Sequence, residues 1–161
     1  MNLIVTLIFV TSLGFLAIYD GMFGELPQAV LTFSVICATI ILILKQWSLF
    51  LGAQNFEFLT SSLLSTLGGV GILAGIYFLL YFCSKEKLVG DGDWILGLAI
   101  ALALGDWWLS LLVLCFSNLL ATIVMLPVTK FKRNTKIYFG PWMVFGYLIV
   151  LVGMETFVNV L

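Results

Sequence analysis

Histidine is absent from the 161 residues, and only 9% of them carry a charge. Because histidine is the one side chain whose unperturbed pKa lies near neutrality, its absence excludes histidine-based catalysis and histidine metal sites. A soluble domain of this size would contain about a quarter charged residues. With 63% hydrophobic residues and a net charge of -1, the composition indicates an integral membrane protein.

Cysteine is scarce as well. Cys37, Cys83 and Cys115 lie far apart in apolar surroundings and form neither a CxxC pair nor another zinc-binding spacing. We interpret them as small buried hydrophobic residues. The first segment lacks the basic start and the A-x-A site of a cleavable signal peptide, so we expect it to remain as a helix.

Long apolar runs dominate the rest of the chain, and a transmembrane helix needs about 20 such residues. The sequence predicts an all-α polytopic membrane protein, with about six transmembrane helices in one bundle and a single domain covering residues 1–161. Between the second and third runs, Gln54, Asn55 and Glu57 indicate a polar connector that could form an amphipathic interfacial segment. The six runs are 2–19, 26–44, 63–82, 94–104, 107–127 and 138–160.

The fourth run is too short to cross a bilayer. Eleven residues at 1.5 Å per residue extend only about 16 Å. Either the bilayer is thinned there, or Asp93 and the glycines before it lie below the membrane surface. Irregular backbone at that depth is tolerated where it lines a wet cavity or packs on protein, so the short helix is itself an indication of a site.

The basic residues predict the orientation. With six helices, six of the seven basic residues fall in loops on one side, and Lys45 alone falls in a loop on the other. Cytoplasmic loops carry the excess of lysine and arginine, so we expect both termini outside and the basic loops in the cytoplasm. The six residues are Lys85, Lys87, Lys130, Lys132, Arg133 and Lys136.

This topology places two aspartates on the same side at the same depth. Asp20 ends the first run and Asp93 precedes the fourth. Two carboxyl groups in one pocket cannot both ionise easily, so one can activate water while the other, protonated, polarises a carbonyl group. Gly90 and Gly92 have no Cβ and would let an extended substrate backbone approach the carboxylate.

Other roles for these residues are open at this point. Asp20 could be a helix-end charge, and Asp93 could be the N-cap of the fourth helix after a glycine turn. Asp20, Asp91 and Asp93 could also bind a hard cation, because such ions accept carboxylate ligands.

Three motifs in order resemble one known family. They are "YDGMFGELPQAVLTF" at 19–33, "GDGDWILGLAIALALG" at 90–105 and "KIYFGPWMVFGYLI" at 136–149. The set is similar to the type IV prepilin peptidases, the GxGD class of membrane aspartyl proteases. The resemblance covers most of the chain, and the combination of three motifs is far more specific than a lone GxGD.

The resemblance implies that Asp20 and Asp93 are a catalytic pair. It implies an aspartyl endopeptidase in the inner membrane of a prokaryotic cell, cleaving the leader of type IV prepilin-like precursors at the cytoplasmic face without a metal or other cofactor. Its partners would be precursors with a basic leader and a hydrophobic helix, together with the lipid bilayer, and not nucleic acid. Residues expected to contact or steer the substrate are Gly90, Gly92, Asp91, Glu25, Pro27, Gly140 and Pro141.

The chain also departs from the family pattern. Longer bacterial members carry an N-terminal domain with two CxxC pairs that is tied to N-methylation, and this chain resembles a short form without it, so methyltransferase activity is not expected. Ile95 stands where many members have a lysine. Two other functions remain alternatives: a small ion-coupled transporter that uses Asp20 and Asp93, and a catalytically silent scaffold of a pilus or secretion assembly.

Overall fold

The computed structural model describes residues 3–53, 56–84, 90–131 and 139–160, which form six α-helices and, within those ranges, no strand. The protein is therefore an all-α polytopic chain, as the sequence predicts. The helices are α1 (Leu3–Phe23), α2 (Gln28–Ala53), α3 (Phe56–Ser84), α4 (Asp91–Leu104), α5 (Trp107–Phe131) and α6 (Gly140–Val160).

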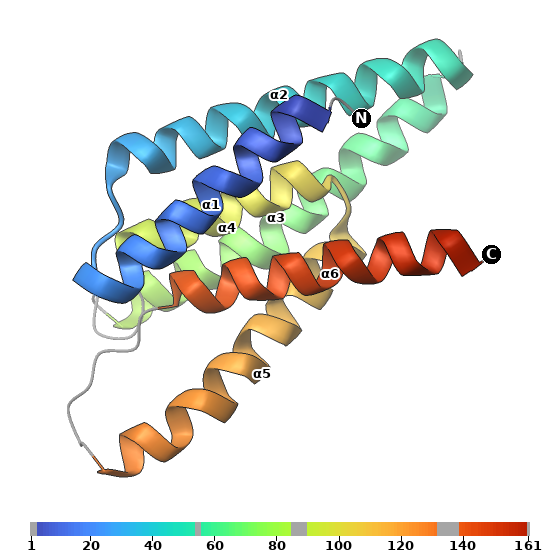
Figure 1. Ribbon diagram of the computed structural model, residues 1–161. Helices are drawn as coiled ribbons and strands as arrows, with labels where there is room; N and C mark the ends of the chain where they lie inside the picture. The colour runs from blue at the N-terminus through green and yellow to red at the C-terminus, as the bar shows by residue number, and fades with distance from the viewer. Residues whose placement is uncertain (1–2, 54–55, 85–89, 132–138, 161) are drawn as a thin grey trace.

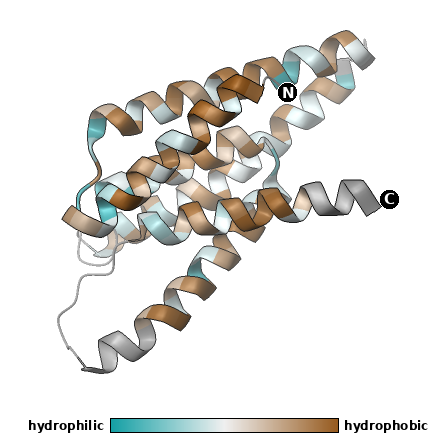
Figure 2. Ribbon diagram, in the orientation of Figure 1, coloured by the Kyte–Doolittle hydropathy of each residue, from teal (hydrophilic) through white to brown (hydrophobic). Residues whose placement is uncertain are grey.

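Four of these helices are long and apolar enough to cross a membrane, namely α1, α2, α3 and α5. The described side chains of α6 form the apolar stretch Gly140–Met154. The 14 residues of α4 extend about 21 Å. Figure 2 shows hydrophobic residues along the coloured parts of the helices, with hydrophilic positions at the α1–α2 connection and between α4 and α5. These features make the chain a membrane protein.

Successive helices run in opposite directions (Figure 1). The ends of α1 and α3 gather with the starts of α2, α4 and α6, and we call this the carboxylate end because Asp20 and Asp93 lie there. The start of α1 and the end of α6 lie toward the opposite end. The second half of α5 diverges from the other helices.

The short helix α4 lies at the centre of the packing. Eight of its 14 residues are buried, and it packs against α2 and α3 along much of its length. At Gly97 an added Cβ would lie 3.4 Å from the Leu73 carbonyl oxygen and 3.5 Å from the Ala74 Cα. A small residue is needed at this position because the backbones of α3 and α4 approach each other closely.

Two predicted helix boundaries were wrong. The second helix was expected to end at residue 44, yet α2 continues to Ala53, and α3 begins at Phe56. The Gln46 amide donates a hydrogen bond to Ser62 Oγ over 2.9 Å, so polar side chains pair across α2 and α3 where the apolar runs have ended. No separate interfacial segment lies in the described part of this region. Glu57 belongs to the first turn of α3, and Gln54 and Asn55 lie outside the described residues.

Lys45 was expected in a loop and instead lies within α2. Its amine donates a hydrogen bond to the Leu104 carbonyl oxygen over 2.8 Å, at the C-terminal end of α4. The turn that follows is made by Gly105, whose φ of 61° is left-handed and favours glycine. The Thr66 hydroxyl donates to the Gly105 carbonyl oxygen over 3.1 Å. The end of α4 is therefore held by side chains of α2 and α3.

The predicted basic loops fall largely outside the described residues. Lys85, Lys87, Lys132, Arg133 and Lys136 occupy positions 85–89 and 132–138, which the structure does not describe. Lys130, which was also expected in a loop, lies within α5. The predicted cytoplasmic orientation therefore stays a prediction.

Candidate active site

Asp20 lies in the last turn of α1 and is only 4% exposed. Its Oδ2 accepts a hydrogen bond of 3.0 Å from the backbone N–H of Gly140, the first residue of α6. The N-terminus of a helix offers free N–H groups and a partial positive charge, both of which suit a carboxylate. The start of α6 thus fixes one oxygen of Asp20.

Gly140 and Asp20 are in close contact. A Cβ added to Gly140 would lie 2.6 Å from Asp20 Oδ2 and 3.1 Å from its carboxylate carbon. One residue further along each chain segment, a Cβ at Gly21 would lie 3.8 Å from Pro141 Cγ. Because position 140 is a glycine, the Asp20 carboxylate can reach the backbone of α6. Gly140 and Pro141, which were expected to contact substrate, thus have a structural role in the contact between α1 and α6.

Asp93 is the third residue of α4 and is 5% exposed. Its Oδ2 accepts a hydrogen bond of 3.0 Å from the Gly90 N–H, while the Asp93 N–H donates to the Gly90 carbonyl oxygen over 3.3 Å. The N-cap of α4 is therefore Gly90, and the alternative that Asp93 is the N-cap does not hold. The helix begins at Asp91 because Asp93 closes its first turn.

The two carboxylates come together although they are 73 residues apart in the sequence. Asp20 belongs to α1 and Asp93 to α4, and they interact electrostatically at the carboxylate end. Each accepts a hydrogen bond from the backbone N–H of a glycine. The arrangement is a buried pair of acids, each oriented by main chain and by the packing of α1, α4 and α6.

The other predicted residues lie around this pair at the same end. An added Cβ at Gly92 would lie 2.7 Å from Leu26 Cδ1, so Gly92 packs against the residue before Pro27. The Pro27 carbonyl oxygen accepts hydrogen bonds from the first turn of α2. Glu25, Gly90 and Asp91 are exposed. Gly90 and Asp91 thus face outward beside Asp93, while Gly92 is in contact with protein rather than open.

Tyr77 is a polar residue of this region that the sequence did not single out. It is fully buried in α3 and interacts electrostatically with Asp93. Its ring packs against Phe139, with 5.5 Å between the ring centroids. In the sequence, Tyr77 is marked only by being a tyrosine inside an apolar run that also contains four glycines. This pattern is weak evidence for a functional residue.

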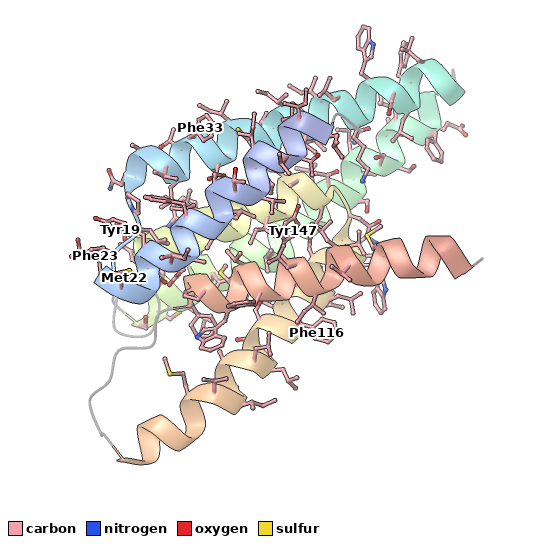
Figure 3. All side chains as sticks on the ribbon, in the orientation of Figure 1. Tyr19, Met22, Phe23, Phe33, Phe116 and Tyr147 are labelled. Carbon is pink, nitrogen blue, oxygen red and sulfur yellow. The ribbon has the colours of Figure 1, made fainter. Side chains whose placement is uncertain are left out.

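Exposed apolar side chains surround the end of α1. Tyr19, Met22 and Phe23 are labelled together beside the α1–α2 connection in Figure 3, and the rings of Tyr19 and Phe23 are 4.6 Å apart. Met22 and Phe23 are 73% and 63% exposed. Such side chains suit the boundary between membrane and water.

The described residues contain no group of three His, Cys, Asp or Glu side chains that could hold a metal ion. Asp20, Asp91 and Asp93 therefore do not converge as the ligand set that the sequence left open. Of the three, Asp91 is exposed and the other two are buried.

A second polar cluster lies at the far end of α4, where we name Lys45, Ser65, Thr66 and Asp106 the α4–α5 corner. Asp106 directly precedes α5, and its Oδ1 accepts hydrogen bonds from the N–H groups of Trp108 at 2.7 Å and Leu109 at 3.2 Å. Its carboxylate also attracts the Lys45 amine. The corner is accounted for by helix capping.

No family model, curated protein or solved structure matches the chain. The functional interpretation of the carboxylate pair therefore rests on its geometry and on the sequence motifs.

Proposed function

We propose that the protein is a membrane aspartyl endopeptidase that removes the leader peptide of type IV prepilin-like precursors. The observation that carries this proposal is the buried pair of Asp20 and Asp93, brought from α1 and α4 to one end of the bundle. The motifs around both residues resemble those of prepilin peptidases.

Asp20 lies within the last turn of α1, where the partial negative charge of the helix C-terminus disfavours a carboxylate. It is also buried, which costs free energy for an ionisable group. The hydrogen bond from the start of α6 offsets part of this cost. A buried carboxyl group that a neighbouring helix holds in place is what one member of a catalytic pair requires.

The reaction needs two carboxyl groups in different protonation states. The ionised one removes a proton from water, whose oxygen bonds to the scissile carbonyl carbon, while the protonated one gives its proton to the carbonyl oxygen. The proton taken from water then moves to the leaving nitrogen as the C–N bond breaks. The hydroxyl proton of the intermediate returns to the second carboxyl group, so both groups recover their starting states.

The surroundings of the pair suit a precursor with a basic leader. Glu25 and Asp91 are exposed at the carboxylate end and would attract positive charge. The hydrophobic helix that follows the cleavage site would lie in the bilayer beside the bundle. We place this end at the cytoplasmic face of a prokaryotic inner membrane, with both termini outside.

The carrier alternative is less well supported. The pair at one end of α4 and the α4–α5 corner at the other are separated by completely buried apolar side chains, among them Leu73, Leu96 and Ile100. A carrier would need polar groups near the middle of the membrane. Between the two clusters, the described residues of α4 and the adjacent part of α3 supply apolar side chains instead.

The proposal is tested by cleavage of a prepilin-like precursor with the protein purified in detergent. Asp20→Asn and Asp93→Asn keep the size of the side chain but remove its acid chemistry, so each is expected to lower kcat by at least about 100-fold. Glu57→Gln is the matched control, because Glu57 is an exposed carboxylate at the opposite end of α3. It is expected to cleave at the wild-type rate.

Cleavage that survives both aspartate substitutions would exclude the pair as the catalyst. A wild-type protein that cleaves none of several precursors, although it is folded, would favour the scaffold alternative. In the same assay, replacing the lysines of the leader by glutamine is expected to raise KM, because the attraction by Glu25 and Asp91 is then lost.

A further inference from the structure

The hydroxyl group of Tyr77 is buried without a hydrogen-bond partner among the residues that the structure describes. The side chain as a whole is 0% exposed. A buried polar group without a partner costs free energy, and such groups are rare enough in folded proteins that each one requires an explanation. A phenylalanine at position 77 would keep the buried ring and would not bury an unpaired hydroxyl group.

The packing of α3 against α4 aims Tyr77 toward Asp93. The two helices run in opposite directions, and their closest approach places Gly97 against Leu73 and Ala74. One helical turn closer to the carboxylate end, position 77 of α3 therefore faces position 93 of α4. The adjacent contact between Phe78 and Trp94, whose ring centroids are 5.6 Å apart, confirms this register.

Tyr77 also contacts the segment that holds the other aspartate. Its ring packs edge-on against Phe139, and the next residue, Gly140, donates the hydrogen bond to Asp20. From α5, the Asn118 side chain lies near the Tyr77 hydroxyl, but its amide nitrogen donates to the Leu114 carbonyl oxygen over 2.7 Å. The second N–H of the same amide can donate to the Tyr77 oxygen, and in that arrangement the hydroxyl proton is free for an acceptor elsewhere.

We propose that Tyr77 is a positioning residue of the carboxylate pair, whose hydroxyl donates a hydrogen bond to the Asp93 carboxylate when the pair closes on a substrate. This inference rests on the proposed endopeptidase function. Asp93 would then accept two hydrogen bonds, from the Gly90 N–H and from Tyr77, and both favour its ionised form.

The hydrogen bond assigns different roles to the two aspartates. Asp93, held ionised, takes the proton from water, and Asp20 donates a proton to the scissile carbonyl oxygen. Among the described residues, the other groups that act electrostatically on Asp93 are Asp20 from α1 and the exposed Asp91 of its own helix, both of them acidic. Tyr77 can thus offset their repulsion by donating a hydrogen bond to the Asp93 carboxylate.

The test is Tyr77→Phe, which removes the hydroxyl and keeps the ring. We expect kcat for precursor cleavage to fall about tenfold with an unchanged KM, and the acid limb of the pH–rate profile to move to higher pH. Tyr147→Phe is the matched control: Tyr147 is 3% exposed, packs edge-on against Phe9, and lies midway along the bundle, away from the carboxylate end (Figure 3). It should leave kcat and the pH profile unchanged.

Three outcomes would overturn the role of Tyr77. The first outcome is a Tyr77→Phe variant whose kcat equals that of the wild type. The second is a Tyr77→Phe variant whose kcat falls while the acid limb of its pH–rate profile does not move, because this result indicates a merely structural effect. The third is an equal effect of Tyr147→Phe. In each of these cases Asp20→Asn and Asp93→Asn can still abolish cleavage, so the endopeptidase function would stand while the positioning role fails.

A second measurement does not depend on cleavage. Infrared spectra of the protein in detergent, recorded over a pH series with Asp93→Asn as the reference, follow the protonated carboxyl band of Asp93. Addition of an uncleaved precursor analogue closes the site, and Tyr77→Phe should then move the pH midpoint of this band upward. An unmoved midpoint overturns the hydrogen bond, even if wild-type protein cleaves nothing.

Discussion

The Asp20 carboxylate is held by a hydrogen bond from the Gly140 N–H, and the two residues are 120 positions apart in the sequence. The Gly140 N–H is a good partner because it belongs to the free N-terminal groups of α6, which have no acceptor within their own helix. The missing side chain of Gly140 is equally important, since any Cβ there would overlap the carboxylate. A single glycine thus provides both a donor and the space for the acid.

Gly140→Ala is expected to displace the Asp20 carboxylate. The added Cβ would lie 2.6 Å from Oδ2, and overpacking of this kind typically costs about 1–3 kcal/mol. Cleavage activity should fall at least about tenfold, because catalytic groups must be held to within a fraction of an ångström. Precursor cleavage and the melting temperature in detergent measure the two effects.

Gly153→Ala is the control in the same helix, because an added Cβ there meets nothing within 4 Å. It should leave both activity and melting temperature unchanged. Full activity in Gly140→Ala would mean that the contact between Asp20 and the start of α6 is not needed.

At the scale of residues, sequence reasoning identified Asp20 and Asp93 but not what surrounds them. The pair follows from topology, because charged residues at the ends of neighbouring apolar runs must share a membrane face. Gly92 was expected to face substrate, and it packs against Leu26 instead. The difference arises because the glycines suggested a turn, whereas the Asp93 carboxylate closes a helical turn that begins at Asp91.

Among the helices, α4 is distinguished by its length and by how its end is held. Its C-terminal carbonyl groups would lie inside the membrane, where water cannot satisfy them. Lys45 of α2 and Thr66 of α3 donate hydrogen bonds to the Leu104 and Gly105 carbonyl oxygens. Side chains of the two neighbouring helices therefore satisfy the carbonyl groups where α4 ends.

Lys45→Met is expected to destabilise the protein by about 1–3 kcal/mol, because the Leu104 carbonyl oxygen loses a charged donor and the methionine side chain cannot replace it. The thermal melting of the purified protein in detergent measures the loss. Lys45→Arg keeps the charge and the donor and should retain most of the stability. Equal melting temperatures for Lys45→Met and the wild type would show that the end of α4 is satisfied in another way.

Helix lengths were the weaker part of the prediction. Apolar runs gave the number and order of the helices, because each run must bury its backbone groups in hydrogen bonds within the membrane. They did not give the extension of α2 to Ala53, a region in which Gln46 of α2 donates a hydrogen bond to Ser62 of α3. A contact between side chains of two helices does not change the hydrophobic periodicity of either helix, so the sequence pattern does not reveal it.

For the molecule as a whole, the proposed orientation puts the carboxylate end in the cytoplasm. Cys83, near the end of α3, is exposed at this end, and Glu57 is exposed at the start of the same helix. In sealed right-side-out membrane vesicles, a membrane-impermeant maleimide should label the thiol of a Glu57→Cys variant directly. Cys83 should react only after the vesicles are permeabilised.

The prediction that all three cysteines are buried was wrong for Cys83 and Cys115, which are exposed, and holds for Cys37. The labelling is therefore measured in a Cys115→Ala background, and the buried Cys37 should stay unreactive. Labelling of Cys83 in sealed vesicles would reverse the orientation and place the pair on the outer face. A cytoplasmic leader could then not reach it.

The link between Asp20 and Gly140 has a consequence for biosynthesis. Helices enter the membrane in the order in which the ribosome makes them, so α1 and α4 with both aspartates are in place while α6 is still unmade. Asp20 acquires its backbone partner when residue 140 has emerged and α6 has inserted. The hydrogen bond that orients Asp20 is therefore made later in synthesis than the two helices that carry the aspartates.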